Sequence, residues 1–139
     1  MAKTMLNGSL VVCSKLVIET TEVSTQLDLK GLFTGRASGK AFEFDVYGWW
    51  APEKIGSVGC ELTWRKRSNP HTVAPKHLHY HDIQVTAEDV KSQYFGLYFT
   101  KIFMPPQDPG EYVVDLVIDG IIVASHPIRI SEKQLFKDD

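Results

Sequence analysis

Apolar and polar residues alternate with a period of two along most of the chain, and Gly, Pro, Asn and Asp interrupt the alternation. The clearest stretch is residues 41–50, where Phe42, Phe44 and Val46 alternate with carboxylates. Successive side chains of a strand point to opposite faces, so this pattern predicts strands with one buried face. No stretch has the period of a long helix, which argues against a fold built from strand–helix–strand units.

The alternating stretches are short, and turn residues separate them. We expect strands at residues 9–19, 26–34, 41–50, 58–67, 78–86, 94–104, 111–118 and 121–130, a turn at 35–40 and one helical turn at 87–92. Asp119-Gly120 predicts a two-residue hairpin, because a type I′ turn needs positive φ at both central residues. About seven to nine such strands indicate an all-β, antiparallel β-sandwich, with a small β-barrel as the alternative.

The chain has the size and composition of one domain. Its 139 residues are 43% hydrophobic, enough for a core without a metal or disulfide staple. We expect a single sandwich over residues 1–139, with short polar termini at about 1–8 and 131–139. No stretch has the ~20 apolar residues of a membrane span, and the N-terminus lacks the apolar core of a signal peptide. We therefore expect a cytoplasmic protein without membrane contact, with export by a route that needs no N-terminal signal as the alternative.

The two cysteines, Cys13 and Cys60, do not make a disulfide framework. Neither belongs to a Cys-x-x-Cys pair, which argues against a zinc ribbon. The simplest interpretation is two buried free thiols, and a single bridge is the alternative.

Asp108-Pro109-Gly110-Glu111-Tyr112 stands at the start of an expected strand. It resembles the Asp-x-Gly-x-Tyr corner of immunoglobulin-like sandwiches, in which the tyrosine hydroxyl bonds to backbone upstream. The cysteines and tryptophans lack the spacing of an antibody domain. With its Asp119-Gly120 hairpin, the C-terminal part is also similar to the end of small uncharacterised bacterial sandwich proteins. The resemblance implies an immunoglobulin-like fold and no particular reaction.

Four of the five histidines are His71, His77, His79 and His81. Residues two apart on a strand share a face with Cα atoms ~6.5–7 Å apart, so the last three could hold a divalent metal such as zinc. Asp82, Glu61 or Cys60 from a neighbouring position could complete the site. The alternatives are a solvent-facing row of imidazoles beside buried Leu78 and Tyr80, and a pH-sensitive surface.

Two adjacent tryptophans, Trp49 and Trp50, end the strand that contains Tyr47. Adjacent residues face opposite ways, so one ring can pack in the core while the other is exposed. An exposed aromatic at a strand end is a common anchor for a protein partner or a sugar ring. The three residues form a candidate binding platform, and the alternative is two packed tryptophans.

Arg65 and Arg67, with Lys66 between them, form the one basic cluster of the sequence. Beside Trp64 they are candidates for binding a phosphate or an RNA base. The alternative is a solvated strand end. Because 17 acidic residues outnumber 15 basic ones, we do not expect nucleic acid as the partner.

The sequence carries no nucleophile motif or phosphate loop, which favours a protein without catalytic activity or cofactor. The leading hypothesis is a non-enzymatic protein-interaction or self-assembly module, with a homo-oligomer as one form. Contacts would come from residues 49–57 and 68–76, or from strand addition. Residues 94–103 carry aromatics on both faces, so a second subunit would cover some of them. The alternatives are a small-ligand or carbohydrate binder that uses Trp49 and Trp50, and a metal-binding protein that uses His77, His79 and His81.

Overall fold

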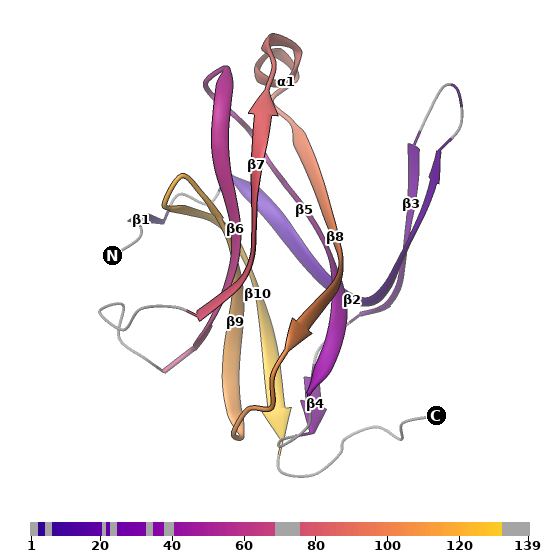
Figure 1. Ribbon diagram of the computed structural model, residues 1–139, viewed down its shortest axis with the longest axis vertical. Helices are drawn as coiled ribbons and strands as arrows, with labels where there is room; N and C mark the ends of the chain where they lie inside the picture. Colours follow the sequence, from indigo (N-terminus) through magenta and orange to yellow (C-terminus); the bar gives the residue numbers. More distant parts are fainter. Residues whose placement is uncertain are drawn as a thin grey trace.

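A computed structural model describes residues 3–4, 7–20, 22, 25–32, 35–37, 41–68 and 76–131 of the chain. These residues form ten strands and one short helix. The strands make two sheets that lie face to face (Figure 1). The predicted all-β sandwich is confirmed, and the alternative of a barrel is wrong because the sheets do not close on each other.

The larger sheet has six strands. Its main path runs β1 (Lys3–Thr4), β10 (Ile121–Ser131), β9 (Gly110–Ile118), β6 (Gly56–Lys66) and β7 (Lys76–Val85), and β4 (Gly35–Ala37) pairs with the end of β10. The two shortest strands, β1 and β4, run parallel to β10, whereas the other pairs are antiparallel.

The smaller sheet has four antiparallel strands in the order β3 (Thr25–Leu32), β2 (Gly8–Thr20), β5 (Phe42–Trp50) and β8 (Phe95–Met104). The helix α1 (Ala87–Ser92) connects β7 to β8. Consequently β7 and β8, the last strands of their sheets, lie beside each other on one side of the sandwich (Figure 1).

The expected strands are present with small shifts of their ends. The hairpin is confirmed, since Asp119 and Gly120 have φ angles of 47° and 80°. The turn expected at residues 35–40 is wrong in part, because β4 forms there by pairing with the end of β10. The polar N-terminus likewise contributes β1.

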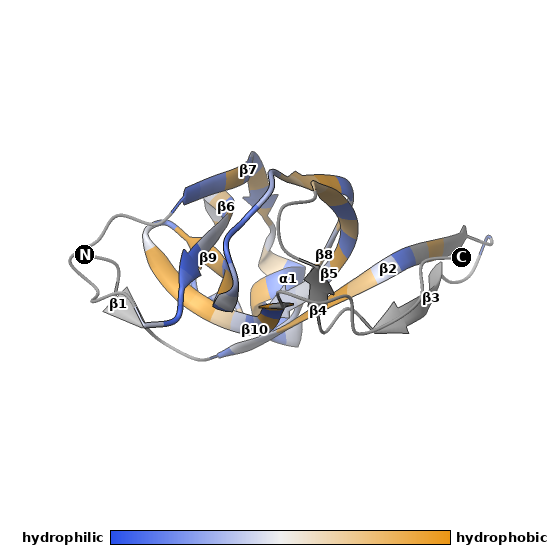
Figure 2. Cartoon of the chain, turned by 90° about the horizontal axis from the view of Figure 1, so that it is seen from below, coloured by the Kyte–Doolittle hydropathy of each residue, from blue (hydrophilic) through white to orange (hydrophobic). Residues whose placement is uncertain are grey.

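One core fills the space between the sheets. The side chains on the inner face of each strand meet there, and the hydropathy colouring follows this division along the strands (Figure 2). The largest fully buried hydrophobic side chains are Phe44, Leu62, Met104, Leu116 and Ile128. Burying such a side chain contributes roughly 1.5–3 kcal/mol to the stability of the fold. The alternating pattern places these residues on the inner face of each strand, where they are buried.

Both cysteines are buried free thiols, as the simpler interpretation predicted. Burial raises the pKa of Cys60 to about 12, so this thiol is protonated at neutral pH. The thiolate is the reactive form of cysteine, and burial disfavours it here.

The corner predicted at Tyr112 has the expected hydrogen bond. Its hydroxyl donates to the backbone carbonyl of Asp108 at 2.8 Å, and its ring lies 5.5 Å from that of Trp64. The bond fixes the entry of the chain into β9.

The one helix of the described residues, α1, is too short to cross a lipid bilayer.

Candidate binding surface

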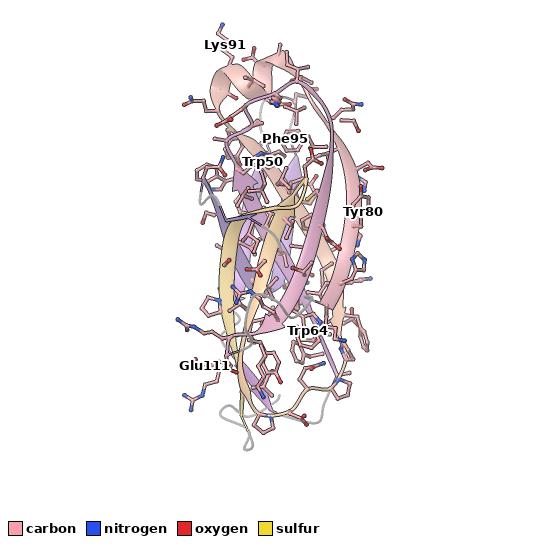
Figure 3. All side chains as sticks on the ribbon, turned by 90° about the vertical axis from the view of Figure 1, so that its left-hand side faces the viewer. Trp50, Trp64, Tyr80, Lys91, Phe95 and Glu111 are labelled. Carbon is pink, nitrogen blue, oxygen red and sulfur yellow. The ribbon has the colours of Figure 1, made fainter. Side chains whose placement is uncertain are left out.

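The adjacent tryptophans Trp49 and Trp50 have opposite environments. Trp50 is 4% exposed and lies in the core, with its ring centroid 5.0 Å from that of Phe95 (Figure 3). It shares the inward face of β5 with Phe44 and Val46. Of the two tryptophans, Trp50 is therefore the one in the core, and Trp49 is the one on the outward face of the strand.

The outward face of β5 carries Trp49 and Tyr47, both half-buried. A third ring joins them: Tyr94 lies 5.8 Å from Trp49 at an interplanar angle of 31°, and its hydroxyl is hydrogen bonded to that of Tyr47. Burial and this hydrogen bond raise the pKa of Tyr47 to about 12. Tyr94 thus takes the place that the sequence interpretation gave to Trp50.

Two local features place Tyr94 there. The helix α1 ends at Gln93, whose left-handed φ of 56° turns the chain, and the Tyr94 N–H donates to the Asp89 carbonyl at 3.2 Å. Gly96 follows, and a Cβ at this position would lie 2.7 Å from the Tyr94 hydroxyl oxygen. The missing side chain of Gly96 leaves room for the tyrosine to reach across to β5, where Gly96 pairs with Trp49.

Two further rings of β8 continue this face. Tyr98 pairs with Tyr47 and is 51% exposed, and Phe103 pairs with Glu43 and is 58% exposed. We call the set Tyr47, Trp49, Tyr94, Tyr98 and Phe103 the β5–β8 aromatic surface. The sequence signal for this surface is that residues 94–103 carry aromatic side chains at both even and odd positions, and therefore on both faces of the strand.

A groove of about 450 Å³ adjoins the aromatic surface, between β7 and β8, which are the last strands of their sheets among the described residues. Its lining comes from these two strands: His79, His81, Ile83, Gly96, Leu97, Tyr98, Phe99, Thr100 and Ile102. Tyr98 belongs to both features, so the groove and the aromatic surface are continuous.

The three histidines of β7 do not share one face. The register between β6 and β7 shifts between Leu62 and Thr63, and His77 pairs with Thr63. His77 then bonds through Nδ1 to Glu61 Oε2 at 2.7 Å. His79 pairs instead with the buried Leu62 and lies on the groove side of the strand. The expected common face is wrong because the register shift changes the phase of the strand.

His79 and His81 remain together in the groove. Their rings are stacked with centroids 6.5 Å apart, and His79 also contacts the edge of Phe99. Within the described ranges, no group of three or more His, Cys, Asp or Glu side chains could hold a metal ion. Tyr80, expected to be buried beside these histidines, is 52% exposed (Figure 3). His71 lies outside the described residues.

Each arginine of the basic cluster faces a carboxylate. Arg65 Nε lies 2.9 Å from Asp115 Oδ2, and Ser125 donates to the other oxygen of Asp115 at 2.5 Å. Arg67 Nη1 lies 3.8 Å from Glu111 Oε2. These carboxylates offset the positive charge of the two arginines, which a bound phosphate would need for its own neutralisation. Most of the predicted contact segment 68–76 lies outside the described residues.

A second hollow, of about 320 Å³, lies at the end of the sandwich beside the loop after β5. Its lining includes Trp50, Val58, Ile118 and Asn7. The side-chain oxygen of Asn7 is buried and has no hydrogen-bond partner.

No protein-family model and no curated protein matches the chain.

Proposed function

We propose that the protein is a non-enzymatic protein-interaction or self-assembly module, and that the β5–β8 aromatic surface and the adjoining edge of β8 bind its partner. The observation that carries this proposal is a row of exposed aromatic rings along the last strand of a sheet and just before it. Tyr94, Tyr98 and Phe103 are 45%, 51% and 58% exposed. Large exposed apolar side chains gathered on one face mark interaction sites more often than isolated ones do.

The chemistry of the rings suits a surface that is exposed to water in the free protein and covered by a partner in the complex. The three tyrosines of the surface carry hydroxyls that hydrate when free and can bond to a partner when covered. Trp and Tyr are also the residue types enriched among the anchors of protein interfaces.

The edge of β8 adds main-chain groups to this surface. Among the described residues β8 pairs only with β5. Lys101 has a left-handed φ of 55°, and its N–H donates to Asp45 Oδ1 at 2.9 Å. This irregularity and the lysine charge interrupt the edge there, as protected edges do. The stretch before Lys101 stays regular and can accept an added strand.

The proposed sandwich class is immunoglobulin-like. Seven strands form its body, with β2, β5 and β8 in one sheet and β10, β9, β6 and β7 in the other. In a constant-type immunoglobulin domain the fourth strand joins the sheet of the first, second and fifth strands. In this protein the fourth strand of the body in chain order is β7, and it pairs instead with the third, β6. The sandwich therefore differs from the constant type in the sheet that its fourth strand joins. The Tyr112–Asp108 hydrogen bond supports the immunoglobulin-like class.

A photo-crosslinking amino acid at Tyr98, compared with one at Tyr80, tests the interaction. The two side chains are 51% and 52% exposed but lie on different sheets. In cells that express the protein at its natural level, we expect crosslinked protein adducts from position 98 and few from position 80. Equal yields at both positions, or none at either, would overturn the proposal.

A small ligand in the end hollow is a second candidate function. The hollow is mostly apolar, its volume is near the lower end of known ligand sites, and the unpartnered Asn7 oxygen offers an acceptor. An apolar dye should quench Trp50 fluorescence in the wild type, and the filling substitution Val58→Trp should abolish its binding. Unchanged dye binding in the filled variant would refute this candidate.

A further inference from the structure

The inner face of β7 changes its chemistry along the strand. At the end next to α1 it carries Ile83 and Val85, which are buried in the core. The same face continues to His81 and His79, because every second side chain of a strand points the same way. Away from α1, β7 and β8 separate (Figure 1), and both imidazoles line the groove between these strands. The strand therefore places two histidines where the core opens to solvent.

The two imidazoles form a pair whose ring nitrogens are free. Their rings are stacked at an interplanar angle of 19°, with centroids 6.5 Å apart. The edge-on contact of His79 with Phe99, at a centroid distance of 5.3 Å, holds one ring against the core. In the part of the chain that the structure describes, no hydrogen bond or ion pair uses a ring nitrogen of either histidine. The Nδ1 atom of His77, by contrast, is bonded to Glu61.

The composition of the groove decides which ligand suits this pair. The described residues that line it include no Asp, Glu, Lys, Arg or Cys. Mg²⁺ and Ca²⁺ prefer carboxylate and other oxygen ligands, which the groove's side chains supply only as the hydroxyls of Tyr98 and Thr100. Imidazole nitrogens instead suit Cu²⁺, Ni²⁺ and Zn²⁺.

The spacing of the rings is close to that of a chelating pair. Two imidazoles that share one zinc ion, each with a nitrogen at about 2.0–2.1 Å, have ring centroids roughly 5–6 Å apart. The observed 6.5 Å is slightly wider. Because His81 is exposed, a small rotation of its side chain is enough to close the pair on an ion.

We propose that His79 and His81 form a two-histidine site for a divalent late transition metal ion, with Cu²⁺ bound more tightly than Ni²⁺ or Zn²⁺. This order is the general one for nitrogen ligands. Two protein ligands leave the other coordination positions open toward the groove of about 450 Å³, where water or a donor atom of a bound molecule completes the shell. The site needs only two side chains, so it is compatible with the lack of any larger ligand group among the described residues. It does not depend on the proposed function.

Metal titrations of the purified, untagged protein test the pair. By isothermal titration calorimetry we expect one Cu²⁺, Ni²⁺ or Zn²⁺ ion per chain and no binding of Mg²⁺. His79→Ala and His81→Ala should each weaken the binding of Zn²⁺ by tenfold or more, because each leaves a single imidazole. His77→Ala is the matched control: His77 bonds to Glu61 and does not line the groove, so the affinity should stay unchanged. Circular dichroism confirms that each variant is folded.

Electron paramagnetic resonance of bound Cu²⁺ counts the nitrogen ligands. The wild type should show coupling to two imidazole nitrogens, and each groove variant coupling to one. The inference is overturned if none of the three ions binds the wild type saturably, or if His79→Ala and His81→Ala bind Zn²⁺ as tightly as the wild type does. A loss in His77→Ala as large as in the groove variants would place the ion elsewhere and also overturn it. The crosslinking comparison of positions 98 and 80 tests the proposed function separately.

Discussion

The β5–β8 pair carries aromatic rings on both faces, and the two faces differ in what covers them. On the inner face, Trp50 and Phe95 pack against the larger sheet. On the outer face, Tyr94 and Tyr98 remain about half exposed. The inner rings pack among apolar side chains, whereas the outer face is rich in tyrosine hydroxyls. The comparison teaches that aromatic content alone does not mark a core: the face that lacks a covering sheet is the one available for recognition.

Truncating one tryptophan from each face should give the largest contrast in stability. Trp50→Ala should lower the free energy of unfolding by about 3–5 kcal/mol, because it opens a cavity in the core. Trp49→Ala should lower it by about 1 kcal/mol or less, since water can fill the space left on the outer face. Denaturation by guanidinium chloride measures both. Equal losses would mean that the two faces are equally buried.

A side chain at Gly96 should disturb only the outer face. Gly96→Val would meet the Tyr94 hydroxyl and displace the ring from Trp49, with a stability loss of roughly 1 kcal/mol. Binding through the aromatic surface should weaken by about tenfold. In the Tyr94→Ala background the same substitution should cost almost nothing, because the two positions are coupled. Additive losses in this double-mutant cycle would contradict the proposed placement of Tyr94.

The smallest expected effect is the response of the outer face to alkaline pH. The pKa of Tyr47 is raised from 10.0 to about 12, so the neutral phenol stabilises the fold. This contribution is complete below the unfolded-state pKa near 10 and is lost as the pH rises toward 12. Tyr47→Phe should therefore flatten the decline in unfolding free energy between these values. A decline of the same slope in the variant would assign it to other groups.

The sequence predicted the strands well because each strand of the body has one face in the core. The alternation also indicates that Trp50 is buried, because Trp50 lies on the same face of β5 as Phe44 and Val46. The sequence analysis left open which of the two adjacent tryptophans packs in the core.

The features missed by sequence analysis depend on long-range register. The β6–β7 shift that turns His77 toward Glu61 leaves no local signal. The position of Tyr94 needs both the end of α1 and the gap at Gly96. The departure of β2 from the sandwich at Cys13 depends on β3 as a new partner, and apolar runs occur along β2 both before and after that point.

Hydroxyl-radical footprinting tests the central claim, that the β5–β8 aromatic surface is where a protein binds. Tyr98 and Tyr80 have nearly equal exposed fractions, 51% and 52%, and serve as probe and control within one chain. In dilute purified protein the two should oxidise at similar rates. In the assembled protein or its complex we expect Tyr98 to be protected several-fold while Tyr80 is unchanged. Equal oxidation of both tyrosines in the two states would contradict the claim.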